Sequence, residues 1–120
     1  MTMDTALLWM LAALNLVPGI VALRPARAET LYGIALDGPA LALAMRHRAV
    51  LLALVGVLLA LAALDPAWLP AAVLVAGVSK LSFVGLFLTT GPHGAPMRRI
   101  ALADAGALAA LGGVIALRFA

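Results

Sequence analysis

The sequence predicts an all-α integral membrane protein: a four-helix bundle that forms a single transmembrane domain over residues 1–120. Two observations carry this prediction. First, 66% of the 120 residues are hydrophobic and only 11% are charged, whereas about a quarter of the residues in a soluble domain are charged. Second, the apolar residues gather in four runs, each close to the ~20 residues that a transmembrane helix needs. The predicted spans cover about residues 5–23, 43–64, 67–89 and 97–117.

Residues that favour turns separate these spans. Asp65 suits a helix cap and Pro66 a first helical position, so together they predict a tight turn into the third span. Glycines and prolines fill the segment 89–96 before the fourth span. The first connector, 24–42, is the longest, and part of it is apolar enough to lie in the membrane interface. Within it, the DGP sequence at 37–39 predicts a chain break followed by a helix start.

The basic residues are distributed unevenly between the two ends of the spans. Six lie in or beside the longer connectors and one lies at the opposite end: Arg24, Arg27, Arg46, Arg48, Arg98 and Arg99 against Arg118. Because basic residues mark the cytoplasmic side, we expect both longer connectors in the cytoplasm and both termini outside. The residues expected to face lipid headgroups are Arg48, Arg98 and Arg99.

The first span is not expected to be a cleaved signal peptide. Its apolar run is too long for such a segment, and no basic residue precedes it. The ARA sequence at 26–28 does resemble a small-residue cleavage site. We therefore expect the first span to remain part of the bundle.

Three polar residues interrupt the spans at similar depth. At ~1.5 Å per residue from the cytoplasmic helix ends, Asn15 lies about 12 Å, Asp104 about 10 Å and Lys80 about 15 Å deep. A lone charge in a span costs at least ~2.5–3.5 kcal/mol, so Lys80 and Asp104, on antiparallel neighbours, are expected to approach each other. Three interpretations stay open: a structural pair that fixes register, a ligand or proton site, or contact with a partner subunit.

A helix kink is expected shortly after Asn15. Pro18 removes one backbone hydrogen bond and Gly19 follows it directly, a combination that bends helices. The bend either serves packing alone or opens the helix beside the polar level.

Arg46 is the fourth member of the expected cluster. It shares a helix face with small residues, and such faces are where helices pack in membranes. These small residues are Ala49, Ala53, Gly56 and Ala60. We therefore expect Arg46 to point inward and Arg48 outward. The buried polar cluster and candidate ligand site then comprises Asn15, Arg46, Lys80 and Asp104.

The charges assigned to this cluster do not cancel. Arg46 and Lys80 exceed Asp104 by one positive charge. Either Lys80 is neutral, or Asp37 or Glu29 folds back from the first connector, or an anion binds. An anionic lipid headgroup of the cytoplasmic leaflet is a reasonable candidate for that anion.

Several kinds of chemistry lack their residues in this sequence. There is no cysteine, and there is no Gly-rich phosphate loop, HExxH motif or Ser-His-Asp set. His47 and His93 are the two histidines, and they are not expected to bind a metal or haem. We therefore predict no catalytic residue, no metal, no cofactor and no nucleic-acid partner.

The order of short motifs resembles that of small four-helix bacterial membrane proteins of the DoxX-like type. The motifs are ETLYG at 29–33, DGP at 37–39, MRHRAVL at 45–51, GVSKLSF at 77–83 and RRIALADAGAL at 98–108. The resemblance implies a four-helix bundle in the bacterial inner membrane and no catalytic residue to transfer. Some relatives carry the label phosphopantetheine adenylyltransferase, but Pro92-His93-Gly94 does not match that enzyme's H-x-G-H motif. DoxX relatives linked to quinone-coupled oxidation suggest a quinone or redox partner.

Three functions follow from these observations. The first is a non-catalytic inner-membrane protein, an accessory subunit or a module that binds a lipid or small ligand. An exposed stripe of small residues on the second or the fourth span would indicate a homodimer or another membrane partner. On the fourth span these residues are Gly106, Ala110 and Gly113. The second is a small proton-coupled transporter that acts as a dimer and uses Asp104. The third is a membrane enzyme acting on a lipid or quinone. The sequence favours the first, so it leans against an enzyme.

Overall fold

The structure, a computed structural model, describes residues 2–35 and 37–119; Leu36, in the first connector, lies outside them. The described residues are all-α and contain no strand. The elements are α1 (Met3–Leu16), the 3₁₀ turn η1 (Val17–Gly19), α2 (Ile20–Leu23), α3 (Arg27–Tyr32), α4 (Pro39–Leu64), the 3₁₀ turn η2 (Pro66–Trp68), α5 (Leu69–Thr89) and α6 (Ala95–Phe119).

Four helical segments are long and apolar enough to cross a membrane. They are Met3–Leu23, Pro39–Leu64, Pro66–Thr89 and Ala95–Phe119. The four helices predicted as spans are thus present, although α4 begins four residues earlier than expected. The cause is local: Gly38, with φ of 91°, breaks the chain, and Pro39 then occupies the first helical position, where its fixed φ is favourable.

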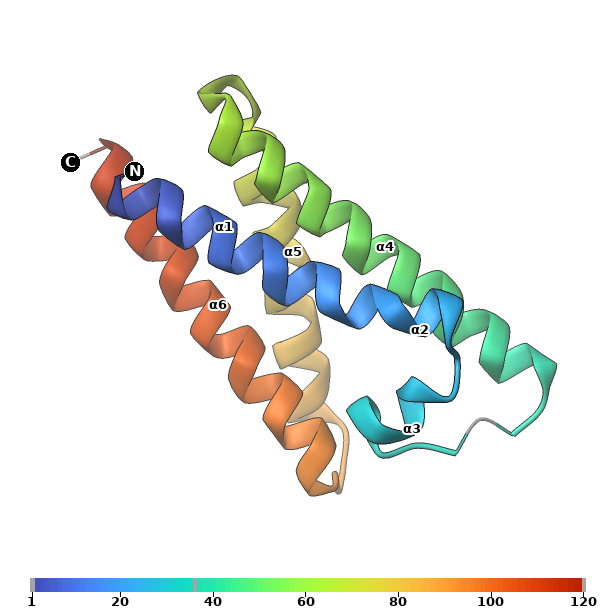
Figure 1. Cartoon of the computed structure of the whole chain (residues 1–120). Helices are drawn as coiled ribbons and strands as arrows, with labels where there is room; N and C mark the ends of the chain where they lie inside the picture. Colours follow the sequence, from blue (N-terminus) through green and yellow to red (C-terminus); the bar gives the residue numbers. More distant parts are fainter. Residues whose placement is uncertain (1, 36, 120) are drawn as a thin grey trace.

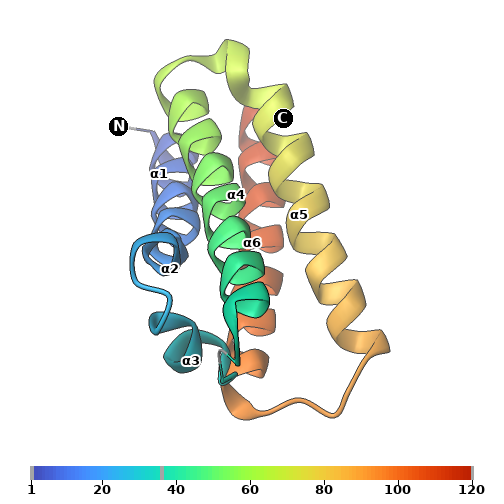
Figure 2. The same ribbon diagram turned by 90° about the vertical axis from the view of Figure 1, so that its right-hand side faces the viewer.

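The four spans run alternately up and down (Figure 1). The start of α1, the end of α6 and the η2 turn lie at one end of the bundle, which we call the terminal end. The small helix α3 and the connector between α5 and α6 lie at the other, the connector end, as the turned view also shows (Figure 2). An ion pair between Arg118 and Asp4 joins α6 to α1 at the terminal end.

The main apolar core holds all four spans together. Its buried residues come from α1, α4, α5 and α6 and include Leu8, Leu11, Val55, Leu59, Leu111 and Val114. Many other core positions are alanine, which lets helix backbones approach closely where lipid provides no hydrophobic drive for association. The association of these helices therefore depends on close packing.

The small-residue face of α4 packs against α1 and η1, as the sequence predicted. A Cβ added at Gly56 would lie 2.8 Å from Cγ of Leu16 and 3.0 Å from the carbonyl oxygen of Ala12. One added at Gly19 would lie 3.2 Å from Cβ of Ala53. The face is therefore used inside the chain, between α4 and the first span.

The first connector folds partly into α3, which docks on the bundle. Ala28 and Tyr32 are buried in a second apolar cluster with Val21 of α2 and Ala49 of α4. Gly33 ends α3 in the left-handed region, with φ of 68°, and lies close to Pro96 at the start of α6. This small helix therefore packs against α2, α4 and the start of α6 at the connector end of the bundle.

Candidate functional site

Three of the predicted polar residues meet at one level. The Nζ atom of Lys80 donates a hydrogen bond of 2.6 Å to Oδ1 of Asn15 and lies 3.4 Å from Oδ1 of Asp104. Asn15 and Lys80 are buried, with 0% and 5% of their surfaces exposed. The predicted approach of Lys80 to Asp104 is therefore confirmed, and Asn15 lies on the other side of the ammonium.

Backbone geometry holds Asn15 in this orientation. Its Nδ2 atom donates a 2.8 Å hydrogen bond to the carbonyl oxygen of Leu11, one turn earlier in α1. The amide oxygen is then left to accept from Lys80. At the position of the predicted kink the α-helix gives way to the η1 turn, which begins two residues later at Val17 and contains Pro18. The helix thus changes geometry directly after the residue that contacts Lys80.

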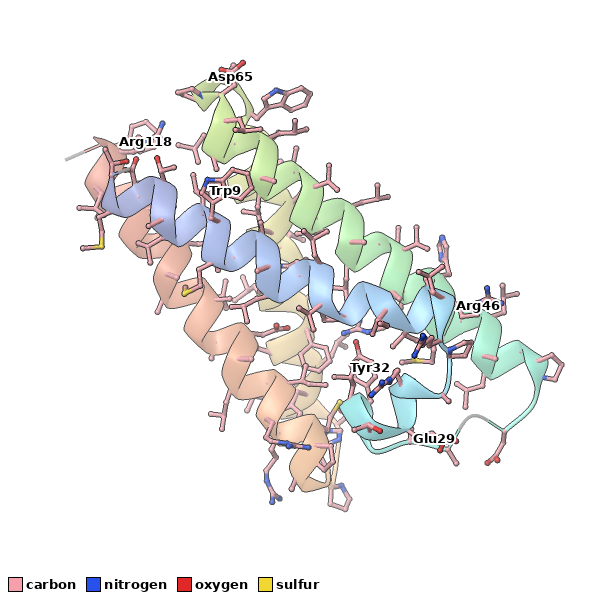
Figure 3. All side chains as sticks on the ribbon, in the orientation of Figure 1. Trp9, Glu29, Tyr32, Arg46, Asp65 and Arg118 are labelled. Atoms are coloured by element: carbon pink, nitrogen blue, oxygen red, sulfur yellow. The ribbon has the colours of Figure 1, made fainter. Side chains whose placement is uncertain are left out.

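Arg46 is not part of this level, which corrects the sequence expectation. Arg46 is exposed, and its Nε atom donates a 2.8 Å hydrogen bond to the carbonyl oxygen of Ala22 in α2. In Figure 3 it extends from α4 beside the end of the first span. The small-residue face does pack inward, but it faces α1 and α2. Arg46, at the end of that face, consequently meets the last turn of α2.

Arg48 takes the place that had been expected for Arg46. Its guanidinium carbon lies 5.4 Å from the ring centre of Tyr32 and 5.2 Å from that of Phe83. Two residues along a helix correspond to a turn of roughly 200°, so Arg46 and Arg48 must face opposite sides. The assignment of Arg48 to lipid headgroups is therefore wrong: the side chain is half-buried between α3 and α5.

Arg48, Lys80 and Asp104 line a common cavity of about 90 Å³. Each is nine residues from the connector end of its helix, about 14 Å along the helix axis at 1.5 Å per residue. The remaining walls are mostly apolar, with Tyr32 from α3 closing one side: they comprise Leu14, Pro18, Leu31, Tyr32, Leu52, Ile100, Ala103 and Ala107. Figure 3 shows Tyr32 directed from α3 toward the bundle.

The charged residues that line this cavity, Arg48, Lys80 and Asp104, carry one positive charge in excess. The sequence analysis reached the same excess but assigned it to Arg46 instead of Arg48. Asp104 pairs with Lys80. Within residues 2–35 and 37–119, the guanidinium of Arg48 forms no hydrogen bond or ion pair; it lies over the rings of Tyr32 and Phe83 and interacts with Asp104 only through the electrostatic attraction of their charges. Neither Asp37 nor Glu29 lines the cavity. Of the three alternatives, the return of a connector acid to this cavity is therefore not supported.

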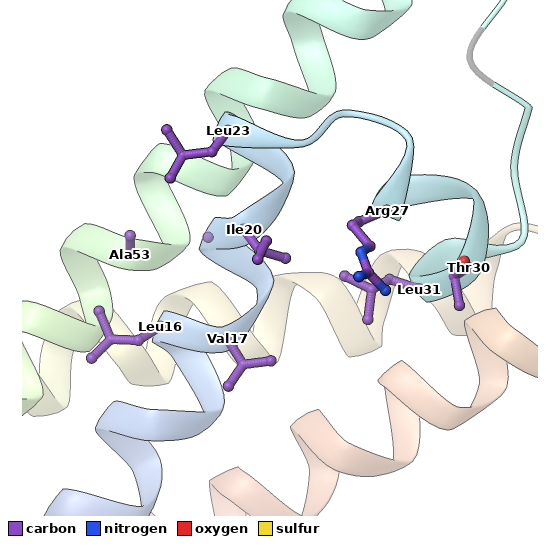
Figure 4. Close-up of a pocket in the computed structure, with 9 residues that line it drawn as sticks. Leu16, Val17, Ile20, Leu23, Arg27, Thr30, Leu31 and Ala53 are labelled. Carbon is purple, nitrogen blue, oxygen red and sulfur yellow. The ribbon is translucent and has the colours of Figure 1, made fainter.

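A second, larger cavity lies against the same helices. It is an apolar groove of about 630 Å³ between the η1–α2 segment, α3 and α4 (Figure 4). Its walls are Leu16, Val17, Gly19, Ile20, Leu23, Arg27, Thr30, Leu31 and Ala53. Leu31 therefore borders both the groove and the polar cavity.

The other residues singled out in the sequence lie elsewhere. Arg98 and Arg99 are exposed in the first turn of α6, at the connector end, and Arg98 donates to the carbonyl oxygen of His93. The ring of His93 stacks on Phe87 with centroids 4.5 Å apart. Among the described residues, no group of three His, Cys, Asp or Glu side chains could hold a metal ion.

The exposed small-residue face expected on the fourth span is largely absent. Gly106 is exposed, but Ala110 packs against the main core and a Cβ at Gly113 would lie 3.7 Å from Leu7 of α1. This face therefore serves contacts within the chain at two of its three positions.

Sequence reasoning missed Arg48, Tyr32, Phe83 and the groove. A signal for Arg48 was present in α4: positions 52, 55, 59 and 62 are buried and continue from Arg48 at three- and four-residue steps. That row, which consists of Leu52, Val55, Leu59 and Ala62, faces the core, whereas the other row of small residues faces α1. The contact with Tyr32 had no sequence signal, because it depends on the docking of α3.

Comparison with known proteins adds no relative: no family model, curated protein or solved structure matches this chain.

Proposed function

We propose that this protein is a non-catalytic membrane module that binds a small carboxylate-bearing ligand in the cavity between α3, α4, α5 and α6. One observation carries the proposal. Arg48 lines a cavity inside the bundle, and none of the described residues forms a hydrogen bond or ion pair with its guanidinium. An anion in that cavity would neutralise the remaining positive charge.

The energetics favour a ligand at Arg48 over one at Lys80. Asp104 and Asn15 already satisfy Lys80. An arginine within a span costs at least about 2.5–3.5 kcal/mol, and contacts with aromatic rings return only about 0.5–2 kcal/mol. A carboxylate can accept two parallel, charge-assisted hydrogen bonds from a guanidinium, and its geometry matches that of the arginine side chain. The Lys80–Asp104 pair then has a supporting role: it fixes the wall of the site.

The proposal is tested by ligand-induced stabilisation. The protein, in nonionic detergent, is heated in acetate and in a chloride control of equal ionic strength. Binding to the folded state raises Tm as the ligand concentration exceeds Kd. We expect acetate to raise Tm of the wild type and of Arg46→Gln, and to leave that of Arg48→Gln unchanged. Equal responses of the two variants would contradict the proposal.

A proton-coupled transporter is the second candidate, because Asp104 is the carboxyl group that lines the cavity. Such a transporter needs an acid that binds and releases a proton beside its substrate. The Asp104→Asn variant in proteoliposomes decides this point: loss of pH-driven uptake of a carboxylate substrate would support transport. Pure binding predicts no uptake by either protein.

We further propose that the chain lies in the bacterial inner membrane, with the connector end cytoplasmic, and belongs to the DoxX-like group. The excess of arginines at the connector end supports the orientation, and the order of sequence motifs supports the grouping. The absence of native cysteine makes the orientation easy to test. An impermeant maleimide applied to intact spheroplasts should label a cysteine at Ala67, in the η2 turn, and spare one at Gly94; the reverse would overturn the orientation.

A further inference from the structure

The apolar groove and the polar cavity are neighbours that share a wall residue. Leu31 of α3 lines both. On the opposite wall, Val17 borders the groove while Pro18, the next residue, borders the cavity. A molecule that passes Leu31 would therefore have one end in the groove and the other beside Arg48.

The groove is accessible from the surface that faces lipid. Val17, Ile20 and Leu23 lie in the first span, and 63%, 41% and 84% of their surfaces are exposed. Figure 4 shows Val17 and Ile20 on the side of the η1–α2 segment that faces α3. An occupant of the groove would thus come from the hydrocarbon region of the bilayer, and it would be apolar.

We propose that the ligand is a single-chain carboxylate amphiphile, a fatty acid taken from the bilayer. Its alkyl chain lies in the groove, and its carboxylate reaches past Leu31 to the guanidinium of Arg48. This inference rests on the proposed function and names the ligand class for the same site.

Size and charge both fit a carboxylate. The cavity is small, at about 90 Å³, and a carboxylate is a smaller anionic group than a phosphodiester. The single negative charge matches the single positive excess among Arg48, Lys80 and Asp104. The groove, at about 630 Å³, gives the chain an apolar wall.

Arg27 gives the anion a path of approach. It lines the groove beside Thr30, is exposed, and forms no side-chain hydrogen bond or ion pair within the described part of the chain. A cation at the entrance raises the local concentration of an anionic ligand. The alternative is that the carboxylate stays at Arg27 and never reaches Arg48, and the experiment distinguishes these two positions.

The test uses two photoreactive probes of equal length, a fatty acid with a mid-chain diazirine and the corresponding alcohol. The protein is placed in nanodiscs of zwitterionic phosphatidylcholine, irradiated with each probe, and analysed by mass spectrometry. We expect the acid to label the groove residues Val17, Ile20 and Leu31, with labelling by the alcohol lower by roughly tenfold or more, as loss of a charge-assisted hydrogen bond predicts. Arg48→Gln should reduce acid labelling to the level of the alcohol, whereas Arg46→Gln and Arg27→Gln should retain most of it.

A second variant separates the groove from the cavity. Val17→Trp fills the groove at an exposed position, so it should abolish labelling by the acid while acetate still raises Tm. Val57→Trp, on an exposed surface of α4 outside the groove, should change neither.

Three outcomes would overturn the inference. Equal labelling by the acid and the alcohol would refute a fatty-acid carboxylate at Arg48, and so would labelling that depends on Arg27 but not on Arg48. If acetate still raised Tm in that case, the proposed anion site itself would stand. Labelling by the acid confined to residues outside the groove would refute the chain position. If the wild type showed neither labelling of the groove by the acid nor a rise of Tm in acetate, the proposed function would be overturned as well.

Discussion

The two halves of the bundle are built differently, although the same four apolar helices run through both. Toward the terminal end, Leu8, Leu59, Leu111 and Val114 pack into a core with at most 4% of any side chain exposed. Toward the connector end, the same helices surround a polar level, and the groove and the polar cavity lie there. The difference indicates that the terminal half holds the helices together while the connector half leaves room for a ligand.

The largest expected effect comes from removing one member of the buried ion pair. Lys80→Leu leaves Asp104 without its cation, and breaking a buried pair this way costs about 3–5 kcal/mol. The double variant Lys80→Leu/Asp104→Leu should recover most of that loss, because an apolar pair needs no charge compensation. Unfolding in a mixed-micelle denaturant series measures both. A double variant no more stable than the single one would show that these residues do not act as a pair.

A substitution in the helix contact of α4 with α1 should have the next largest effect. Gly56→Leu places atoms against Leu16 and the backbone of Ala12, and overpacking of this kind costs about 1–3 kcal/mol. Gly112→Leu is the matched control, since no atom lies within 4 Å of a Cβ there. Thermal unfolding in detergent should show a lower Tm for Gly56→Leu alone. Equal Tm values would mean that close approach of these helices is not required.

The docking of α3 can be tested with two glycines of positive φ. Gly33 and Gly38 have φ of 68° and 91°, but only a Cβ at Gly33 meets a neighbour, Pro96 at 2.9 Å. Backbone strain should cost about 1–2 kcal/mol in Gly33→Ala, in the left-handed region, and about 1–3 kcal/mol in Gly38→Ala, in a region that is essentially restricted to glycine. Only Gly33→Ala should also displace α3 from α6. Hydrogen exchange of the α3 amides should therefore accelerate more in Gly33→Ala. The same exchange rates in both variants would argue against docking through this contact.

The smallest effect is expected from the ring that faces Arg48. Tyr32→Leu removes a cation–π contact worth about 0.5–2 kcal/mol, while Tyr32→Phe keeps the ring. The acetate concentration at half-maximal stabilisation should change in the leucine variant and stay constant in the phenylalanine variant. A change of equal size in both would assign the effect to the hydroxyl group instead.

The sequence was informative where a single helix determines the outcome. Span positions followed from apolar runs, and the meeting of Asn15, Lys80 and Asp104 followed from depth along each helix. Arg46 and Arg48 were exchanged because two rows of residues on α4 both qualify as packing faces, and composition alone does not say which neighbour each row meets. The positions of Tyr32 and the groove depend on how α3 folds back, which is a tertiary contact between segments far apart in the chain.

The central claim, a carboxylate held at Arg48, is tested most directly by a distance measurement in lipid. Protein with ¹⁵N-labelled arginine is reconstituted with a fatty acid carrying ¹³C at its carboxyl carbon, and dipolar dephasing between the two nuclei is recorded by solid-state NMR. The account predicts dephasing that corresponds to a distance of about 4 Å between a guanidinium nitrogen and the carboxyl carbon, as in a direct charge-assisted hydrogen bond. This dephasing should disappear in Arg48→Gln and persist in Arg46→Gln. Dephasing that survives in Arg48→Gln, or none in the wild type, would contradict it.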